Sequence, residues 1–206
     1  MLAAFGKRHW WPGDTSLEVM VGAILTQNTA WKNVEKALHN MKSRDLLDVK
    51  ALSTVSEEYL ADTIRSSGFY NIKAHRLKGL MKIICDTFHG STDNPNSLDT
   101  EKLRKLLLGV DGIGPETADS ILLYAFNRPV FVVDAYTRRF LRQHRLTEDS
   151  GTYDEIQQYF VTNLPSDTYL FNEFHALIVC LCQSFCRKVP ICRSCPLEED
   201  LIAYRV

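Results

Sequence analysis

The segment Leu106 to Phe126, LLLGVDGIGPETADSILLYAF, constrains the fold of this chain more than any other part of the sequence. Apolar residues at helical spacing lie on both sides of a Gly-Ile-Gly turn, and Pro115 suits the first position of the second helix. Glycine at Gly112 and Gly114 permits positive φ and the close approach of a partner to the backbone. We therefore predict a helix–hairpin–helix at about residues 100–126, with Ile113 holding the hairpin to the core.

The same turn indicates a partner. The first N–H groups of the second helix lack acceptors within that helix, so they form a site for a DNA phosphate. A Gly-x-Gly turn alone is weak evidence, because plain helix–helix connections also contain it. Here VFVVDAYTRRF follows closely, and it places Asp134 before another helical pattern, where it is also suited to cap the helix.

Helical patterns cover most of the remaining chain, and the fold class that they predict is all-α. Thr15-Ser16-Leu17-Glu18 has the form of a capping box. Apolar positions place Ile72, Leu77 and Leu80 on the inner face of a helix. The run Pro129 to Val133 resembles a strand but is too isolated to build a sheet. The expected helices start near Thr15 and cover about residues 31–41, 56–65, 71–89, 100–108, 115–125, 135–144, 153–164 and 167–185.

Composition excludes several classes of protein. Hydrophobic residues make up 45% of the 206 residues, which is too many for a disordered chain. No apolar run approaches the roughly 20 residues of a membrane span, and the first residues are charged, unlike a signal peptide. We therefore expect a cytoplasmic protein without membrane contact, associated with the nucleoid in a bacterium or archaeon.

The net charge of −1 on its own argues against a nucleic-acid partner, but it is only an average over 24 basic and 25 acidic residues. Two groups of cations lie close in sequence to candidate DNA-binding elements, although such runs are more often solvated helix faces. They are Arg138, Arg139, Arg142 and Arg145 in one group, and Lys73, His75, Arg76 and Lys78 in the other.

The hairpin followed by Asp134 resembles the helix–hairpin–helix (HhH-GPD) DNA glycosylase superfamily, in its endonuclease III group, from about Trp10 to Cys195. The resemblance implies a two-lobed helical fold with the active site in the cleft between the lobes. Residues 20–130 would form the central lobe with the hairpin and the wedge loops. Residues 1–19 and 131–206 would form the second lobe. The implied partner is double-stranded DNA with a damaged base, bound by a monomer.

In that family an aspartate that matches Asp134 lies at the active site. Its carboxylate can stabilise the oxocarbenium-like sugar and orient or deprotonate the attacking water. Bifunctional members carry a lysine two residues after the second hairpin glycine, where this chain has Glu116. Because a carboxylate forms no imine, the implied enzyme is a monofunctional hydrolase that leaves an abasic site, unless another lysine substitutes.

The N-terminal region resembles the endonuclease III-like 3-methyladenine glycosylases, through Trp10-Trp11-Pro12 and the LTQNT segment before Trp31. The resemblance implies that Trp10 and Trp31 stack on the flipped base, although tryptophans also pack in cores. A cationic alkylated purine suits electron-rich indole faces, and its glycosidic bond is already weak. The base pocket would contain Trp10, Trp11, Trp31, Glu116 and Tyr136.

Further residues are expected at the DNA. Gln27 matches the residue that fills the gap left by the flipped nucleotide, and a polar helix end is an equally good interpretation. Phe69 matches a second wedge, with burial as the alternative. The remaining expected DNA-binding residues are Gly112, Ile113, Gly114, Thr117 and Arg138.

The C-terminal cysteines point to a metal or an iron–sulfur site rather than to disulfides, because they are clustered. Cys186, Cys192 and Cys195 resemble three ligands of the family's [4Fe–4S] loop, and Leu201 stands at the fourth position. Cys182, one helical turn before Cys186, is the candidate replacement. A site without metal and a zinc site are the alternatives.

Two other functions stay open at this point. The first is a glycosylase for another damaged or mismatched base. The second is a damaged-DNA-binding protein that does not catalyse. Asp134 favours an enzyme.

Overall fold

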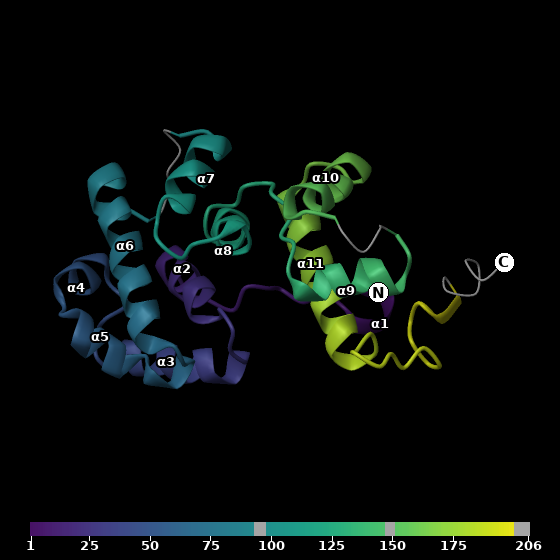
Figure 1. Ribbon diagram of the computed structural model, residues 1–206, viewed down its shortest axis with the longest axis horizontal. Coiled ribbons are helices and arrows are strands. Elements are labelled where there is room, and N and C mark those ends of the chain that lie inside the picture. The colour runs from purple at the N-terminus through teal and green to yellow at the C-terminus, as the bar shows by residue number, and fades with distance from the viewer. Residues whose placement is uncertain (93–97, 147–150, 200–206) are drawn as a thin grey trace. The chain divides into compact units, whose positions relative to one another are not determined.

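The computed structural model describes residues 1–92, 98–146 and 151–199, and within these ranges every regular element is a helix. The all-α prediction is therefore confirmed. The chain forms two compact units, which are coloured along the sequence in Figure 1. Unit 1 comprises Met1–Trp10 and Pro129–Val206, and unit 2 comprises Trp11–Arg128. None of the described helices is long and apolar enough to cross a membrane.

Unit 2 is built around α2 (Ser16–Leu25), which is buried at every residue after Ser16. A largely apolar helix must be enclosed, and α2 packs against several of the elements that follow it. The other elements of unit 2 are α3 (Trp31–Lys42), α4 (Val49–Thr54), α5 (Glu57–Thr63), η1 (Arg65–Ser67), α6 (Tyr70–Phe88), α7 (Thr100–Leu108), α8 (Pro115–Ser120) and the π-helical turn η2 (Ile121–Ala125). Figure 1 shows α4 and α5 lying along the long helix α6.

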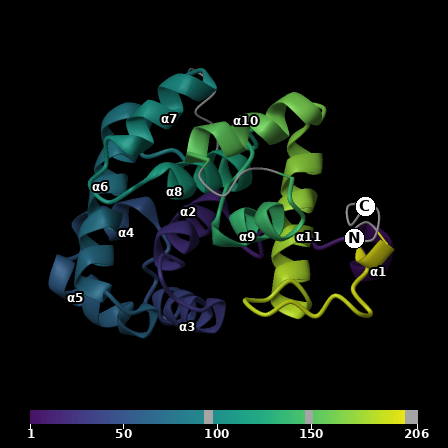
Figure 2. The ribbon, with the colours of Figure 1, turned by 45° about the vertical axis from the view of Figure 1, so that its right-hand side comes forward.

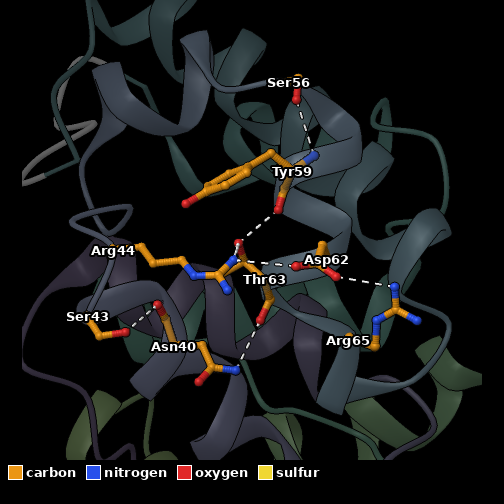
Figure 3. Close-up of polar contacts among 8 residues, drawn as sticks. All are labelled: Asn40, Ser43, Arg44, Ser56, Tyr59, Asp62, Thr63 and Arg65. Carbon is orange, nitrogen blue, oxygen red and sulfur yellow. Dashed lines mark hydrogen bonds and ion pairs between the residues drawn. The ribbon is translucent and has the colours of Figure 1, made fainter.

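Polar contacts join the end of α3 and the residues that follow it to α5 (Figure 3). The Arg44 guanidinium donates to Thr63 Oγ1 at 2.6 Å, and the Asn40 amide donates to the Thr63 carbonyl at 3.3 Å. Arg44 also lies over the Tyr59 ring, 5.2 Å from its centroid. These contacts fix the short helix α5, whose N-terminus Ser56 caps.

The ion pair between Asp119 and Arg104 in unit 2 is partly buried. Asp119 in α8 is fully enclosed and accepts hydrogen bonds from Arg104 in α7, at 2.7 Å to Nε and 3.1 Å to Nη2. This bidentate geometry locks together the two helices that carry the hairpin.

Unit 1 contains α1 (Leu2–Phe5), α9 (Ala135–Gln143), α10 (Tyr153–Asn163) and α11 (Thr168–Ser184). Helices α1 and α9 both contact α11. Figure 2 shows α9 beside α11. Phe131 stacks on Phe160 with ring centroids 3.8 Å apart and forms the centre of the core. The buried Glu173 carboxylate accepts the backbone N–H groups of Arg8 and His9, at 2.8 Å each, so the N-terminal residues are held by α11.

Some predicted details are wrong. The helix expected over 115–125 changes to a π-turn after Ser120. Ile72 is 51% exposed, because Lys73 and Ala74 take the inward positions of α6. Thr15 caps α2, but Glu18 accepts the N–H of Asp14 and so does not complete a capping box. The short helices α1 and α4 were not expected.

Candidate functional site

In the hairpin between α7 and α8, one of the two glycines has the positive φ that the sequence predicts, and the other does not. Gly112 has φ +75°, and a Cβ there would lie 1.9 Å from Arg76 Nε. Gly114 has φ −89°, so it needs no left-handed conformation, and no atom lies within 4 Å of the position of a Cβ. Gly114 therefore leaves the backbone open to the approach of a partner. Ile113 is buried and holds the hairpin to the core, as predicted.

Gln27 lies beside this hairpin. Its Nε2 donates to Thr117 Oγ1 at 2.9 Å and to the Gly112 carbonyl at 3.2 Å. Its Oε1 accepts from Arg76 Nη1 at 2.5 Å. The amide is thus oriented from both ends, and Thr117 is buried against Gln27.

Phe69 stands at the N-terminus of α6 in an unusual position. It is 64% exposed and its φ is +47°, which is rare for a bulky residue. Burial, the alternative interpretation of the sequence, is excluded. Gly68 before it also has a positive φ of 66°, so the backbone turns sharply and presents the ring to solvent.

Three aromatic residues gather within unit 2. The Trp11 ring lies edge-on to Trp31 with centroids 5.3 Å apart, and it lies 5.4 Å from Tyr124. The sequence did not identify Tyr124. No sequence pattern marks Tyr124, but the structure places it in the π-turn η2, and π-turns in helices are frequent at functional sites.

The position of Trp11 depends on the backbone of α2. A Cβ built on Gly22 would lie 3.1 Å from both Cζ2 and Nε1 of the indole. Gly22 thus leaves the space in which the indole lies against the helix. Trp10, the other tryptophan of the pair, belongs to unit 1 and is half-buried. Glu116 is exposed in the first turn of α8.

Asp134 is the N-cap of α9 in unit 1. Its Oδ1 accepts the Thr137 N–H at 2.7 Å, and its Oδ2 lies 3.5 Å from His175 Nε2. Burial raises the pKa of the Asp134 carboxyl, but the charge of His175 and the Thr137 N–H outweigh burial, so the pKa lies below its ordinary value. The result is a half-buried, ionised carboxylate. His175 is a second residue that the sequence did not identify, since it lies in a distant helix.

The residues after Asp134 are largely engaged in the fold. Arg138 Nη1 donates to the Gly151 carbonyl at 2.7 Å. The Arg139 guanidinium lies 5.0 Å from the Tyr136 ring centroid and donates to the Cys182 carbonyl.

The cations near the start of α6 are also turned inward. Lys73 is buried, Arg76 reaches Gln27, and Lys78 Nζ donates to the Leu52 and Ser53 carbonyls at 2.8 and 3.0 Å. This run is therefore not the open basic face that the sequence suggests.

The cysteine side chains of the described residues do not fit a metal cluster as they lie. No three His, Cys, Asp or Glu side chains between residues 1 and 199, apart from the two gaps, are placed to hold a metal ion. The Cys186 thiol donates to Gln143 Oε1, and Cys182 Sγ donates to the Tyr136 carbonyl at 3.5 Å. Leu201 lies outside the described residues. The iron–sulfur cluster therefore stays a prediction.

The sequence is similar to those of known DNA repair proteins. A protein of Methanocaldococcus jannaschii, provisionally named a DNA repair glycosylase, is 48% identical over 97% of this chain and 91% of its own length. Endonuclease III of Thermotoga maritima is 28% identical over 91% of this chain and 83% of its own length.

Solved structures extend the comparison. The 3-methyladenine DNA glycosylase of H. pylori, MagIII, bound to 1,N6-ethenoadenine, is 33% identical with a TM-score of 0.69, over 82% of this chain and 86% of that chain. An endonuclease III–DNA complex has the same fold, with a TM-score of 0.81 at 20% identity, over 100% of this chain and 94% of that chain.

The family is defined by a match over most of the chain. Residues 21–166 match the HhH-GPD superfamily of base excision DNA repair proteins, a range that includes the hairpin and Asp134. This chain belongs to that superfamily and is a DNA glycosylase of base excision repair.

Proposed function

We propose that this glycosylase hydrolyses the N-glycosidic bond of an alkylated purine, with 3-methyladenine as the main substrate, and leaves the DNA strand intact. The observation that carries the proposal is the cluster of Trp11, Trp31 and Tyr124. Two indoles and a phenol ring offer electron-rich faces to a flat, positively charged base. The similarity to MagIII, whose structure contains an adenine derivative, supports the same substrate class.

Asp134 supplies the chemistry. Methylation at N3 makes the purine a good leaving group, so little protonation of the base is needed. The ionised carboxylate stabilises the positive charge that develops on the sugar and orients the attacking water. His175, 3.5 Å from Asp134, helps to keep the carboxylate ionised.

Glu116 determines how the reaction ends. It stands where bifunctional relatives have the amine that attacks the sugar, and a carboxylate cannot form that imine. The product is therefore an abasic site, which breaks only on treatment with alkali.

Gln27 and Phe69 make the base accessible. The exposed Phe69 ring would enter the base stack as a wedge, and Gln27 would occupy the space left by the flipped nucleotide. The hairpin at Gly112 and Gly114 would receive a phosphate of the same strand. A monomer suffices for these steps.

A panel of duplexes tests the proposal. Duplexes carrying 3-methyladenine, ethenoadenine, an oxidised purine or a mismatch are incubated with the protein, and products are analysed with and without alkali. We expect fastest release of 3-methyladenine, strand breaks only after alkali, and no adduct with borohydride. Fastest release of a different base would indicate the second candidate substrate class, and binding without any release would indicate a non-catalytic protein. Strand cleavage without alkali would contradict the role given to Glu116.

A further inference from the structure

Lys73 is a buried cation that the reaction does not use. Its side chain lies in the core of unit 2, with only 1% of the residue exposed. A buried lysine needs hydrogen-bond acceptors, because an unpaired charge in the interior is costly. Its ammonium donates to two backbone carbonyls, that of Leu25 at 2.8 Å and that of Ser67 at 2.7 Å.

The two carbonyls lie at the ends of two helical elements, and each element leads into a different loop. Leu25 is the last residue of α2, two positions before Gln27. Ser67 is the last residue of η1, two positions before Phe69. One ammonium group thus holds the base of each loop whose tip is proposed to enter DNA.

Lys73 keeps its charge at this point, although burial and the charge of Arg76 disfavour it. The last carbonyls of α2 have no N–H donors within the helix and form the negative end of its dipole. Arg76, three residues after Lys73 on the same face of α6, adds its contact with Gln27. Burial and the charge of Arg76 lower the pKa of Lys73 to about 8, which leaves it charged at neutral pH. Both hydrogen bonds are therefore charge-assisted.

We propose that Lys73 is a positioning residue that joins the Gln27 loop, residues 26–29, to the Phe69 loop, residues 67–69, so that both enter the DNA as one unit. The inference rests on the DNA-inserting roles proposed for Gln27 and Phe69. A link formed during folding removes the cost of ordering the two loops separately at the moment of binding.

Lys78 provides a matched control on the same helix. Its ammonium also donates to two backbone carbonyls, those of Leu52 and Ser53, but these belong to α4. Lys73→Met and Lys78→Met therefore remove the same kind of contact from α6. Only the first removes it from the two loops.

Hydrogen exchange of the free protein tests the link without DNA. In Lys73→Met we expect faster exchange in both loops together, while Lys78→Met leaves them unchanged. Acceleration in only one of the loops, or in neither, would overturn the proposal. If Lys73→Met does not fold, Lys73→Gln takes its place, because it keeps an N–H donor but loses the charge and some reach.

A double-mutant cycle tests whether the link acts on DNA. Gln27→Ala, Phe69→Ala and the double variant are compared by their Kd for a duplex with a tetrahydrofuran abasic-site analogue. With Lys73 present, we expect the double variant to differ from the product of the single effects by at least about threefold. In the Lys73→Met background the effects should simply multiply, while Lys73→Arg should keep part of the coupling. Equal coupling with and without Lys73 would overturn the proposal.

The duplex analogue carries no base, so this result does not depend on the lesion. A protein that releases no 3-methyladenine but shows the Lys73-dependent coupling would refute the proposed substrate and support the link. If even the wild type fails to bind the duplex, the roles of Gln27 and Phe69 in DNA fail with it, and so does the proposal.

Discussion

The indole of Trp11 lies against α2 at the one place where the helix has no side chain, Gly22. A methyl group there would meet Cζ2 and Nε1 of the indole at 3.1 Å, closer than ordinary contact. The Trp11 and Trp31 rings meet edge to face at an interplanar angle of 83°, so the orientation of the pocket aromatics depends on the contact with Gly22.

Gly22→Ala should therefore displace Trp11 and slow base release by about 10- to 100-fold, since small misplacements are costly in catalysis. Overpacking should cost about 1–3 kcal/mol of stability. Gly79→Ala is the control, because its Cβ would lie 2.9 Å from Val110 Cγ1, away from the aromatic cluster. Single-turnover rates and urea unfolding separate the two effects. Equal rates in the two variants would refute the role of Gly22.

Asp134→Asn should lower the rate of base release by about 10²–10³-fold, because the amide cannot stabilise positive charge on the sugar. Asparagine still caps a helix, so stability should change little. Asp167→Asn is the matched control, since Asp167 caps α11 through the Leu170 N–H at 2.6 Å. Binding to the abasic-site duplex checks that Asp134→Asn still recognises DNA. Activity in Asp134→Asn close to that of Asp167→Asn would exclude Asp134 as the catalytic residue.

His175→Gln should move the acid limb of the pH–rate profile to higher pH. In the native protein His175 helps to hold the pKa of Asp134 below its ordinary value, despite burial. Without the charge of His175, burial dominates and the pKa of Asp134 rises. On acidification, the variant carboxylate is therefore protonated at a higher pH than the native one. Single-turnover rates between pH 4 and 8 measure the limb. An unchanged or lowered limb would contradict the pairing.

Arg104→Met should destabilise the protein by about 3–5 kcal/mol, because it leaves the enclosed Asp119 carboxylate without its bidentate partner. Arg65→Met removes an exposed ion pair with Asp62 and should cost less than about 1 kcal/mol. Thermal and urea unfolding give both values. Recovery in the Arg104→Met/Asp119→Leu double variant would identify the unpaired charge as the cause.

Local features of the structure could be predicted from the sequence. Helix starts at Asp134 and Asp167 could be predicted because each carboxylate accepts the backbone N–H three residues later. The Gly-Ile-Gly turn between two helical patterns predicts the hairpin, and the burial of Ile113 is expected with it.

Contacts between distant segments could not be predicted. His175 meets Asp134 from another helix, and Tyr124 meets Trp11 through a register change that no pattern announces. The cations of α6 were misjudged for a related reason. A sequence shows that Lys73 is charged but not that carbonyls from two other segments enclose it.

During synthesis on the ribosome, the N-terminal residues of unit 1 cannot form their native contacts until the C-terminal part of the chain has been made. Arg8 and His9 bond to Glu173, which follows them by 165 and 164 residues. Unit 2 is one continuous stretch, so it can fold as soon as Arg128 has emerged. The lobe with Asp134 closes only after translation has passed α11. The newly made protein therefore has its hairpin and aromatic cluster before it has its catalytic carboxylate in place.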